Sequence, residues 1–239
     1  MKAIWYEAEI FDIIDESPKV KRFWFRMPPE ANFSFKAGQF VMLDLPIQAK
    51  YTNRSYSISS APTDDSTFEL CIVLKEDGIG TTWVWENIKV GSKIKTAGPL
   101  GKFILPEVID KDICFICTGT GIAPLRSQLM EIFNKNIPHK DIYMIFGNRI
   151  ISDVLYRKEM EELEAEHPEF HFIPVLSRET PETWKHLGYV HKYYLDLYGD
   201  KQKPVMFYIC GWSSMVREAR DKLKELGYTK DELKFELYD

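Results

Sequence analysis

One stretch decides the fold: residues 113–124, which read ICFICTGTGIAP. A run of five apolar residues, 113–117, is followed by the turn Thr118-Gly119-Thr120-Gly121. An amphipathic stretch comes next, with Pro124 near its start, where the missing N–H of proline has no helical partner in any case. This order predicts a buried strand, a tight turn and a helix, the unit from which parallel sheets are built.

The pattern continues from this stretch to the C-terminus. Further apolar runs alternate with amphipathic stretches, which is typical of repeated βαβ units. The predicted strands are 113–117, 142–146, 170–176, 205–210 and 233–237, and the predicted helices are 123–134, 154–166, 190–198 and 214–226. We therefore expect an α/β domain with a doubly wound parallel sheet over residues 105–239.

The chain before this stretch reads differently. Apolar and polar residues alternate in short runs bounded by proline, serine and glycine, which predicts strands rather than helices. The predicted strands are 3–14, 20–27, 39–45, 54–59, 67–75 and 93–98, with one helix at 81–87. Six short strands predict an antiparallel six-stranded β-barrel over residues 1–104. The chain is thus expected to form two domains that meet near Leu105-Pro106.

Composition excludes several classes of protein. With 45% hydrophobic and 28% charged residues, the chain matches an ordinary globular protein rather than a fibrous or disordered one. No apolar run approaches the roughly 18 residues that a membrane span needs, and Glu7 and Glu9 stand where a signal peptide would be apolar. Only four cysteines are present, which favours a cytoplasmic location, and a net charge of −5 argues against nucleic-acid binding.

Lysines and arginines of the first 104 residues offer a further, weaker signal. They balance the acidic residues there, 13 against 13, so this half is the more basic one. They could form patches attractive to an acidic partner, although scattered solvated lysines are the simpler interpretation. The residues concerned are Lys19, Lys21, Arg22, Lys89, Lys93, Lys95 and Lys102.

Two motifs carry chemistry. The turn at 118–121 can place free backbone N–H groups around a dinucleotide pyrophosphate, but Pro124 stands at the third glycine of G-x-G-x-x-G, and a tight turn with no ligand gives the same pattern. The second motif is RSYSISS, residues 54–60. Its arginine can pair with a pyrophosphate and its tyrosine can stack on a flat heterocycle, yet the residue types alone fit any polar edge strand.

Together the two motifs resemble the ferredoxin–NADP reductase family, flavoproteins with an antiparallel barrel followed by a nucleotide-binding α/β domain. The resemblance runs from about residue 4 to the end. Further matching pieces in the expected order are Gly38-Gln39-Phe40, Gly98-Pro99-Leu100-Gly101-Lys102-Phe103, Tyr208-Ile209-Cys210-Gly211 and Glu236-Leu237-Tyr238.

The resemblance implies a flavin site in the first domain and favours FAD over FMN. It implies that Arg54 binds the flavin phosphates, that Tyr56 lies against the ring, and that Ser57 is a catalytic residue near the atom that accepts hydride. Ser60 is expected beside them. The start of the short helix, Gly80-Thr81-Thr82, is expected to hold the pyrophosphate, since a helix N-terminus presents free N–H groups.

The resemblance also implies a nicotinamide nucleotide as hydride donor. Ser177, Arg178 and Tyr189 look like the family's contacts to the 2′-phosphate and adenine of NADP, with Lys185 as a further cation. NADPH is therefore favoured, while NADH remains possible, because some NADH-using relatives carry a similar Ser-Arg pair. Thr118, Gly119, Thr120 and Gly121 complete the expected nucleotide site.

The resemblance also implies three catalytic residues: Cys210, at the end of a nucleotide-domain strand beside the nicotinamide, and Glu236 and Tyr238 at the C-terminus. For Cys210 a buried structural cysteine is the alternative, and no covalent role is implied. Strand alternation puts Glu236 and Tyr238 on one side of their strand. In relatives that end in Glu-x-Tyr the aromatic ring covers the flavin face that the nicotinamide must occupy, so Tyr238 would be a gate. Asp239 is one residue beyond the plant-type ending, and its charge could instead draw Tyr238 into solvent.

Other chemistry is set aside. Cys114 and Cys117 are three apart in a strand and face opposite sides, so they are expected to be buried apolar residues rather than metal ligands. No metal site is expected, because neither histidine nor cysteine spacing fits one. The sequence GWSSM at 211–215 lacks the second glycine of a hydrolase elbow, so the serines at 213 and 214 fit helix capping or a nucleotide contact better.

The expected function is an FAD-dependent NAD(P)H oxidoreductase that passes electrons to a separate ferredoxin or flavodoxin, because no iron–sulfur domain is fused within this sequence. A reductase component of an oxygenase and a reductase of free flavin are alternatives. A non-catalytic electron-transfer or nucleotide-binding subunit is the alternative from another class. The sequence does not indicate an oligomeric state.

Overall fold

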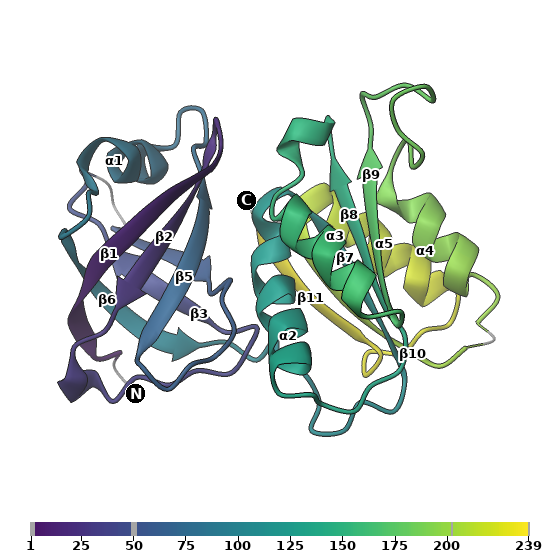
Figure 1. The fold of residues 1–239 in the computed structure, drawn as a ribbon, viewed down its shortest axis with the longest axis horizontal. Helices are drawn as coiled ribbons and strands as arrows, with labels where there is room; N and C mark the ends of the chain where they lie inside the picture. Colours follow the sequence, from purple (N-terminus) through teal and green to yellow (C-terminus); the bar gives the residue numbers. More distant parts are fainter. Residues whose placement is uncertain (1–2, 49–51, 202, 239) are drawn as a thin grey trace. The chain divides into compact units, whose positions relative to one another are not determined.

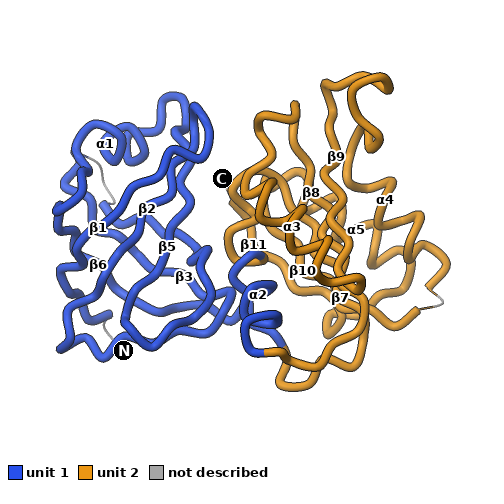
Figure 2. The backbone as a smooth tube through the Cα atoms, viewed as in Figure 1, with its two compact units in different colours: residues 1–105, 126–135 blue, residues 106–125, 136–239 orange. Residues whose placement is uncertain are grey.

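The computed structural model describes residues 3–48, 52–201 and 203–238, so the expectation about Asp239 lies outside the described residues. Backbone contacts divide the chain into two compact units, coloured in Figure 2. Unit 1 comprises residues 1–105 and 126–135, and unit 2 comprises residues 106–125 and 136–239. Residues 126–135 thus cluster with unit 1, although they follow the first strand of unit 2 in the chain. The predicted boundary between residues 104 and 105 refers to cofactor domains and stays a prediction.

Unit 1 contains a six-stranded antiparallel sheet in the order β4-β3-β6-β1-β2-β5 (Figure 1). A bridge between Ile58 and Leu70 joins the end of β4 to β5, so the sheet closes on itself. This confirms the predicted six-stranded barrel. Its elements are β1 (Trp5–Ser17), β2 (Val20–Arg26), a short 3-10 turn (Pro29–Ala31), β3 (Phe40–Asp44), β4 (Asn53–Ser57), β5 (Thr67–Val73), α1 (Ile79–Asn87) and β6 (Lys93–Leu100).

Alternation along the strands fills the barrel. In β1, Ala8 and Ile10 are buried while Glu7 and Glu9 are exposed, and Phe25 stacks on Phe68 with ring centroids 5.1 Å apart. The core therefore consists of the inward-facing side chains of all six strands together with Val84 and Ile88 from the helical segment.

The basic side chains of unit 1 lie next to acidic ones. Lys95 of β6 faces Glu7 across the strand pair, and Lys93 faces Glu9. Lys19 forms an ion pair with Glu76 at 2.6 Å, and Lys21 lies 3.6 Å from Asp15. This arrangement agrees with the simpler interpretation of solvated lysines, because the positive charges are balanced locally.

Unit 2 contains a five-stranded parallel sheet in the order β11-β10-β7-β8-β9. Helices α4 and α5 pack in one apolar cluster on one face, and α3 lies on the other (Figure 1), which confirms the doubly wound sheet. The elements are β7 (Asp112–Thr118), a 3-10 turn (Gly119–Gly121), the first turn of α2 (Ile122–Asn134, which belongs to unit 1 from residue 126 on), β8 (Ile142–Asn148), a 3-10 turn (Ile151–Asp153), α3 (Arg157–Glu166), β9 (Phe170–Leu176), α4 (Val190–Tyr198), β10 (Val205–Trp212), α5 (Ser213–Glu225) and β11 (Leu233–Tyr238).

Helix α3 begins at Arg157, three residues later than predicted. A 3-10 turn occupies 151–153, and the buried Tyr156 has a left-handed backbone with φ of 53°. Glycine and asparagine are the residues that usually adopt this conformation, and a tyrosine rarely does. The sequence therefore contains no signal for the late start of the helix.

A buried charge cluster supports unit 1. The Glu69 side chain of β5 is fully buried, and its carboxylate lies 2.6 Å from Arg22 of β2 and 3.8 Å from Arg126 of α2. The Ser59 hydroxyl donates to the same carboxylate at 2.8 Å, and the Arg126 guanidinium donates to the Ser59 carbonyl at 2.7 Å. Opposite charges and hydrogen bonds compensate for the desolvation of a buried carboxylate.

None of the helices in the described part of the chain is long and apolar enough to cross a membrane.

Candidate functional site

Strand β4 carries the predicted flavin ligands of unit 1. It pairs with β3, so that Tyr56 stands opposite Val41 and Arg54 opposite Leu43. Arg54 and Tyr56 are both half-buried and alternate with exposed residues, which puts them on one side of the strand. Burial raises the pKa of Tyr56 to about 12, against the opposing effect of the Arg54 charge, so the phenol is neutral at physiological pH. Ser57, at the end of the strand, is buried.

The first turn of α1 lies directly beside Arg54. A Cβ added at Gly80 would lie 3.1 Å from Arg54 Nε and 3.4 Å from Arg54 Cγ, so the absence of a side chain leaves room for the arginine. The Thr82 N–H already donates to the Gly78 carbonyl, whereas the N–H groups of the two preceding residues belong to the first turn, which has no earlier carbonyl to bind. A guanidinium and a helix N-terminus therefore meet at one place, and this combination suits a pyrophosphate.

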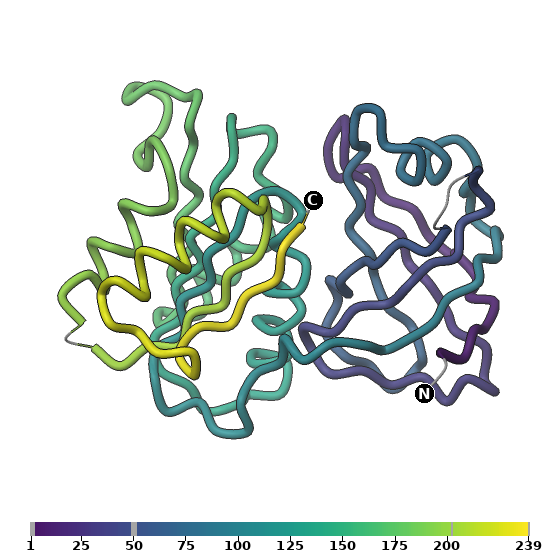
Figure 3. The backbone as a smooth tube through the Cα atoms, turned by 180° about the vertical axis from the view of Figure 1, so that it is seen from behind, coloured from purple at the N-terminus to yellow at the C-terminus, as the bar shows by residue number. Residues whose placement is uncertain are grey.

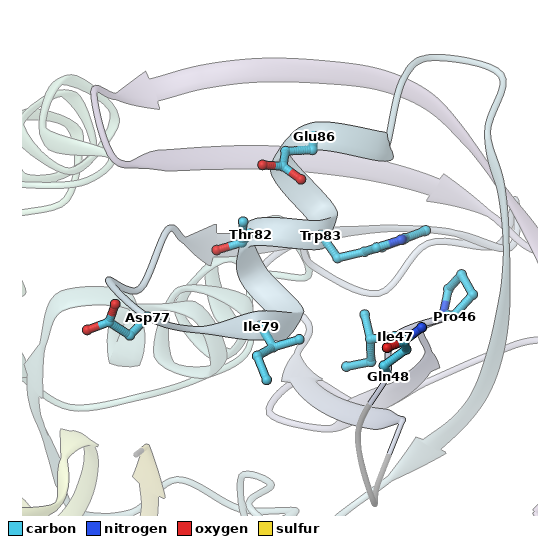
Figure 4. A pocket seen from close by; sticks show the side chains of 8 residues that line it. All are labelled: Pro46, Ile47, Gln48, Asp77, Ile79, Thr82, Trp83 and Glu86. Atoms are coloured by element: carbon cyan, nitrogen blue, oxygen red, sulfur yellow. The ribbon is translucent and has the colours of Figure 1, made fainter.

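The two threonines of this turn differ. The Thr81 hydroxyl accepts a hydrogen bond from Lys75 N–H at 3.1 Å and lies 3.2 Å from the Gly78 carbonyl, so it stabilises the turn. Only the backbone N–H of Thr81, and not its hydroxyl, is therefore expected to bind a phosphate. Thr82 instead lines an open cavity of about 520 Å³ (Figure 4). The other lining residues are Pro46, Ile47, Gln48, Asp77, Ile79, Trp83 and Glu86.

Ser60 has a structural part in the same region. Its hydroxyl accepts the Glu69 N–H at 3.1 Å, and its carbonyl accepts the Ser127 hydroxyl at 2.6 Å. Ser60 is therefore held by β5 and α2, next to the buried charge cluster. Its predicted contact with a cofactor stays a prediction.

In unit 2 the predicted nucleotide turn, 118–121, lies against the carboxyl end of β10, residues 210–212. The Trp212 N–H donates to the Thr118 hydroxyl at 3.1 Å. A Cβ on Gly121 would lie 2.4 Å from the Cys210 carbonyl oxygen, and one on Gly211 would lie 2.3 Å from Thr118 Oγ1. Only glycine permits this approach, and the result is two helix N-termini side by side at the carboxyl ends of two neighbouring strands. That edge of a doubly wound sheet is where ligands bind.

The predicted C-terminal residues converge on Cys210. Strand β11 is at the edge of the sheet beside β10 (Figure 3), with Glu236 in register with Cys210 and Tyr238 with Trp212. Burial raises the pKa of the Cys210 thiol well above its ordinary value; the nearby Glu236 carboxylate raises it further and the Tyr238 side chain lowers it. The thiol is thus protonated at neutral pH. Phe235 and Leu237 point the opposite way and are exposed, so strand alternation holds.

A third cluster forms where β8 and β9 end. Ser177 follows β9, and its N–H donates to the Asn148 carbonyl at 3.1 Å. The Arg178 N–H donates to the Arg149 carbonyl at 2.8 Å, so two exposed arginines are neighbours. Tyr189, 75% exposed, immediately follows Gly188, whose N–H donates to the Leu176 carbonyl. The exposed tyrosine therefore immediately precedes α4, next to the residue that bonds to the end of β9, after which Ser177 follows.

Arg149 was missed by the sequence reasoning. It follows directly after β8, as Ser177 follows β9, and the ends of neighbouring parallel strands meet at one edge of the sheet. The predicted strand ended at 146, two residues short of β8, so Arg149 did not stand at the end of a predicted strand. Lys185 is exposed and directly precedes His186. The His186 carbonyl accepts a hydrogen bond from the Leu176 N–H, so Lys185 lies near the end of β9.

The cysteines of the chain bear on the question of a metal site. Cys114 and Cys117 are free and buried, as predicted. Within residues 3–48, 52–201 and 203–238, no group of three or more histidine, cysteine or acidic side chains is placed to hold a metal ion.

Two family models match the chain. Residues 7–104 match the oxidoreductase FAD-binding domain, and residues 115–221 match the oxidoreductase NAD-binding domain. The protein is thus an FAD-dependent NAD(P)H oxidoreductase that transfers electrons.

Relatives narrow the class. The chain is 31% identical over 242 residues to ferredoxin–NADP reductase B of Sorangium cellulosum, covering 98% of both chains. It is 28% identical to the phenol hydroxylase P5 protein of Acinetobacter pittii, covering 92% of this chain and 62% of that one. The chain belongs to the ferredoxin–NADP reductase family of flavoproteins.

Solved structures agree on the fold. A cytochrome P450 reductase from Amycolatopsis, GcoB, superposes with a TM-score of 0.87 at 24% identity, over 98% of this chain and 69% of that one. A ferredoxin–NADP⁺ reductase from Neisseria gonorrhoeae, with bound FAD and NADP, gives 0.81 at 24% identity over 99% of both chains.

Proposed function

We propose that this protein takes electrons from NADPH and delivers them to a small protein carrier, a ferredoxin or a flavodoxin. The observation that carries the proposal is the similarity to a ferredoxin–NADP reductase over 98% of both chains. The test is reduction of cytochrome c by NADPH and the purified protein, with and without added ferredoxin or flavodoxin. We expect reduction to depend on one of the carriers, and rates that neither carrier changes would contradict the proposal.

A reductase component of an oxygenase is the second candidate. The phenol hydroxylase P5 protein and a glycine betaine monooxygenase reductase subunit of Chromohalobacter salexigens are both similar to this chain, which spans about three fifths of their length. A free-flavin reductase is the third, and it would hold its flavin weakly. The flavin content after gel filtration separates it from the other two, since a tightly held FAD is expected in both of them.

We assign the flavin site to residues 1–104 and the nucleotide site to 105–239. FAD, when bound, accepts hydride from the nicotinamide and releases the electrons singly. Arg54 and the first turn of α1, Gly80 to Thr82, would neutralise the pyrophosphate, because their positive ends meet beside Gly80. Tyr56 would lie against the flavin ring as a neutral phenol, and Ser57 would offer its hydroxyl to the ring edge.

The cavity beside Thr82 supports FAD rather than FMN. It adjoins the proposed pyrophosphate site, and its walls combine the flat indole of Trp83 with Ile47 and Ile79 (Figure 4). The carboxylates of Asp77 and Glu86 can accept hydrogen bonds from an exocyclic amine. An adenine ring presents both features, so the adenosine half of FAD suits this cavity.

We propose that NADPH is preferred over NADH. A 2′-phosphate would meet Arg178, the Ser177 hydroxyl and also Arg149, whose backbone bond to Arg178 supports their joint action. Tyr189 would stack on the adenine, for which its 75% exposure leaves the ring available. NADH has no 2′-phosphate and would therefore lack these contacts to Ser177, Arg178 and Arg149.

Cys210, Glu236 and Tyr238 would act together at the nicotinamide. A protonated thiol packs without charge against the ring, and the neighbouring Glu236 carboxylate can orient the carboxamide. If Tyr238 competes with the nicotinamide for space, Tyr238→Ser should lower KM for NADPH and slow product release, hence lower kcat. Leu237→Ser, on the opposite side of β11, is the matched control and should change neither. An unchanged KM and kcat in Tyr238→Ser would contradict the role.

The four free cysteines, all buried, are compatible with a reducing compartment. We propose a cytoplasmic location, which cell fractionation of the native host would test.

A further inference from the structure

An exposed tryptophan stands at the nucleotide turn of unit 2. Trp212 ends β10, and 60% of its surface is exposed, an unusual state for the largest apolar side chain. Its backbone is fixed by the bond from its N–H to the Thr118 hydroxyl, at 3.1 Å. The side chain is therefore held beside the turn rather than carried on a free loop, and its exposure calls for an explanation other than random surface placement.

The nitrogen edge of the indole faces Gly119. Apart from the adjoining residues of the turn itself, a Cβ built on Gly119 would have one heavy atom within 4 Å among the described residues, and that atom is Trp212 Nε1 at 3.6 Å. The ring carbons of the indole are farther away. The space above the glycine is otherwise open, so a ligand resting on the turn would meet the indole N–H from the side.

The chemistry of this space suits an anion. Residues 119–121 form a 3-10 turn that leads into α2, so their N–H groups are at a helix N-terminus. The indole N–H is a donor with no acceptor capacity, and it adds a further donor on the open side. A diphosphate has several oxygens that can accept hydrogen bonds from the backbone N–H groups and from the indole N–H at once. A neutral sugar both donates and accepts hydrogen bonds, so a site made only of donors suits it less well.

We propose that Trp212 is a further nucleotide-binding residue, whose indole N–H donates to the diphosphate bridge of the nicotinamide nucleotide. The inference rests on the proposed assignment of the 118–121 turn to that nucleotide. It identifies the bridge as the recognised group, in contrast to the 2′-phosphate assigned to Ser177, Arg178 and Arg149. Because NADPH and NADH share the bridge, Trp212 should strengthen binding of both equally and should not discriminate between them.

Two probes separate the groups. ADP-ribose carries the diphosphate without nicotinamide, and 2′-AMP carries the 2′-phosphate without any 5′-phosphate. In Trp212→Phe, which keeps an aromatic ring but removes the N–H, the Kd for ADP-ribose measured by calorimetry should rise about tenfold, the usual effect of one hydrogen bond to a charged group. The Kd for 2′-AMP should stay within about twofold, and the ratio of kcat/KM for NADPH to that for NADH should not change.

Two further variants make the outcome decisive. Trp5→Phe, in unit 1, controls for the loss of an indole elsewhere. Gly119→Leu fills the space above the turn and should also raise the Kd for ADP-ribose. Thermal melting checks that each variant folds. If Gly119→Leu weakens the binding of ADP-ribose and Trp212→Phe does not, the inference about Trp212 is wrong but the assignment of the turn to the nucleotide is supported. If neither variant weakens it, the assignment of the turn is wrong as well. Equal losses for ADP-ribose and 2′-AMP in Trp212→Phe would also overturn the inference, since they would show a general disturbance.

Discussion

In unit 1 the predicted ligand groups are side chains of one strand, Arg54, Tyr56 and Ser57, and the strand that carries them is followed by Ser59 and Ser60, which the buried charge cluster holds. In unit 2 the predicted groups around the diphosphate are backbone turns whose closeness depends on Gly121 and Gly211. The first site therefore depends mainly on side-chain charge, with Gly80 leaving room for Arg54, and the second mainly on the absence of side-chain volume. Substitutions should damage the two in different ways, and the following experiments test this difference.

The largest effect is expected in the charge cluster. Glu69→Ala removes the carboxylate that Arg22 and Arg126 both face inside unit 1, and the free energy of unfolding should fall by about 3 to 5 kcal/mol. Urea denaturation measures it. Lys19→Ala, which breaks an exposed pair with Glu76, should cost less than about 1 kcal/mol. Equal effects of the two variants would mean that the buried cluster does not stabilise unit 1.

In unit 2 the corresponding test adds a single methyl group. In Gly121→Ala the new Cβ meets the Cys210 carbonyl oxygen at 2.4 Å, so the backbone must shift and the free energy of unfolding should fall by about 3 kcal/mol. Gly119→Ala in the same turn meets only Trp212 Nε1, at 3.6 Å, and should cost about 1 kcal/mol for its left-handed backbone. Chemical denaturation of both variants compares them, and a Gly121→Ala protein as stable as Gly119→Ala would show that the turns need not touch.

A smaller loss is expected when a ligand charge of unit 1 is removed. Arg54→Ala should weaken FAD binding by about 1.5 to 3 kcal/mol, since a phosphate loses its guanidinium partner. Released flavin is measured by absorbance after ultrafiltration. Ser55→Ala changes an exposed neighbour on the other side of β4 and serves as the control. Full FAD content in Arg54→Ala would contradict the assignment of Arg54 to the FAD site.

The smallest effect should appear in unit 2 at the arginine pair. Arg178→Ala should lower kcat/KM for NADPH about tenfold, or 1.4 kcal/mol, and leave the value for NADH nearly unchanged. Arg149→Ala should act in the same direction. Arg157→Ala, whose guanidinium pairs with Glu161 on α3, is the control and should leave the ratio unaltered. The nucleotide preference would have to be withdrawn if the ratio stayed constant in the first two variants.

Local patterns predicted nearly every element. The helix at 190–198 and the strand at 170–176 have the predicted bounds, because apolar periodicity and flanking turn residues define such segments without help from the rest of the chain. Local patterns do not place Arg54 beside Gly80 or Glu236 beside Cys210. The family resemblance suggested these groupings, and their part in a cofactor site stays a prediction.

What the sequence could not predict depends on contacts between distant residues. Nothing near Glu69 in the chain shows that Arg22 and Arg126 will surround it, 47 and 57 positions away. The Thr81 hydroxyl is taken by a turn that begins at Lys75, so a residue of the right type at the right place gives its side chain to the fold. The late start of α3 follows from a left-handed tyrosine for which no local rule exists.

The division of α2 has a consequence for dissecting the gene. The helix starts within unit 2, at Ile122, but Arg126, Ser127 and Gln128 bond to Ser59, Ser60 and Phe103 of unit 1. A fragment cut after Leu105 would retain Glu69 without Arg126, and the remaining fragment would carry three polar side chains whose acceptors had been removed. Neither half is therefore expected to express as an independent, well-folded product, although each matches a separate domain model. Recombination that exchanges one half for a homologous half should succeed only when the crossover carries the 126–135 segment together with the barrel it serves.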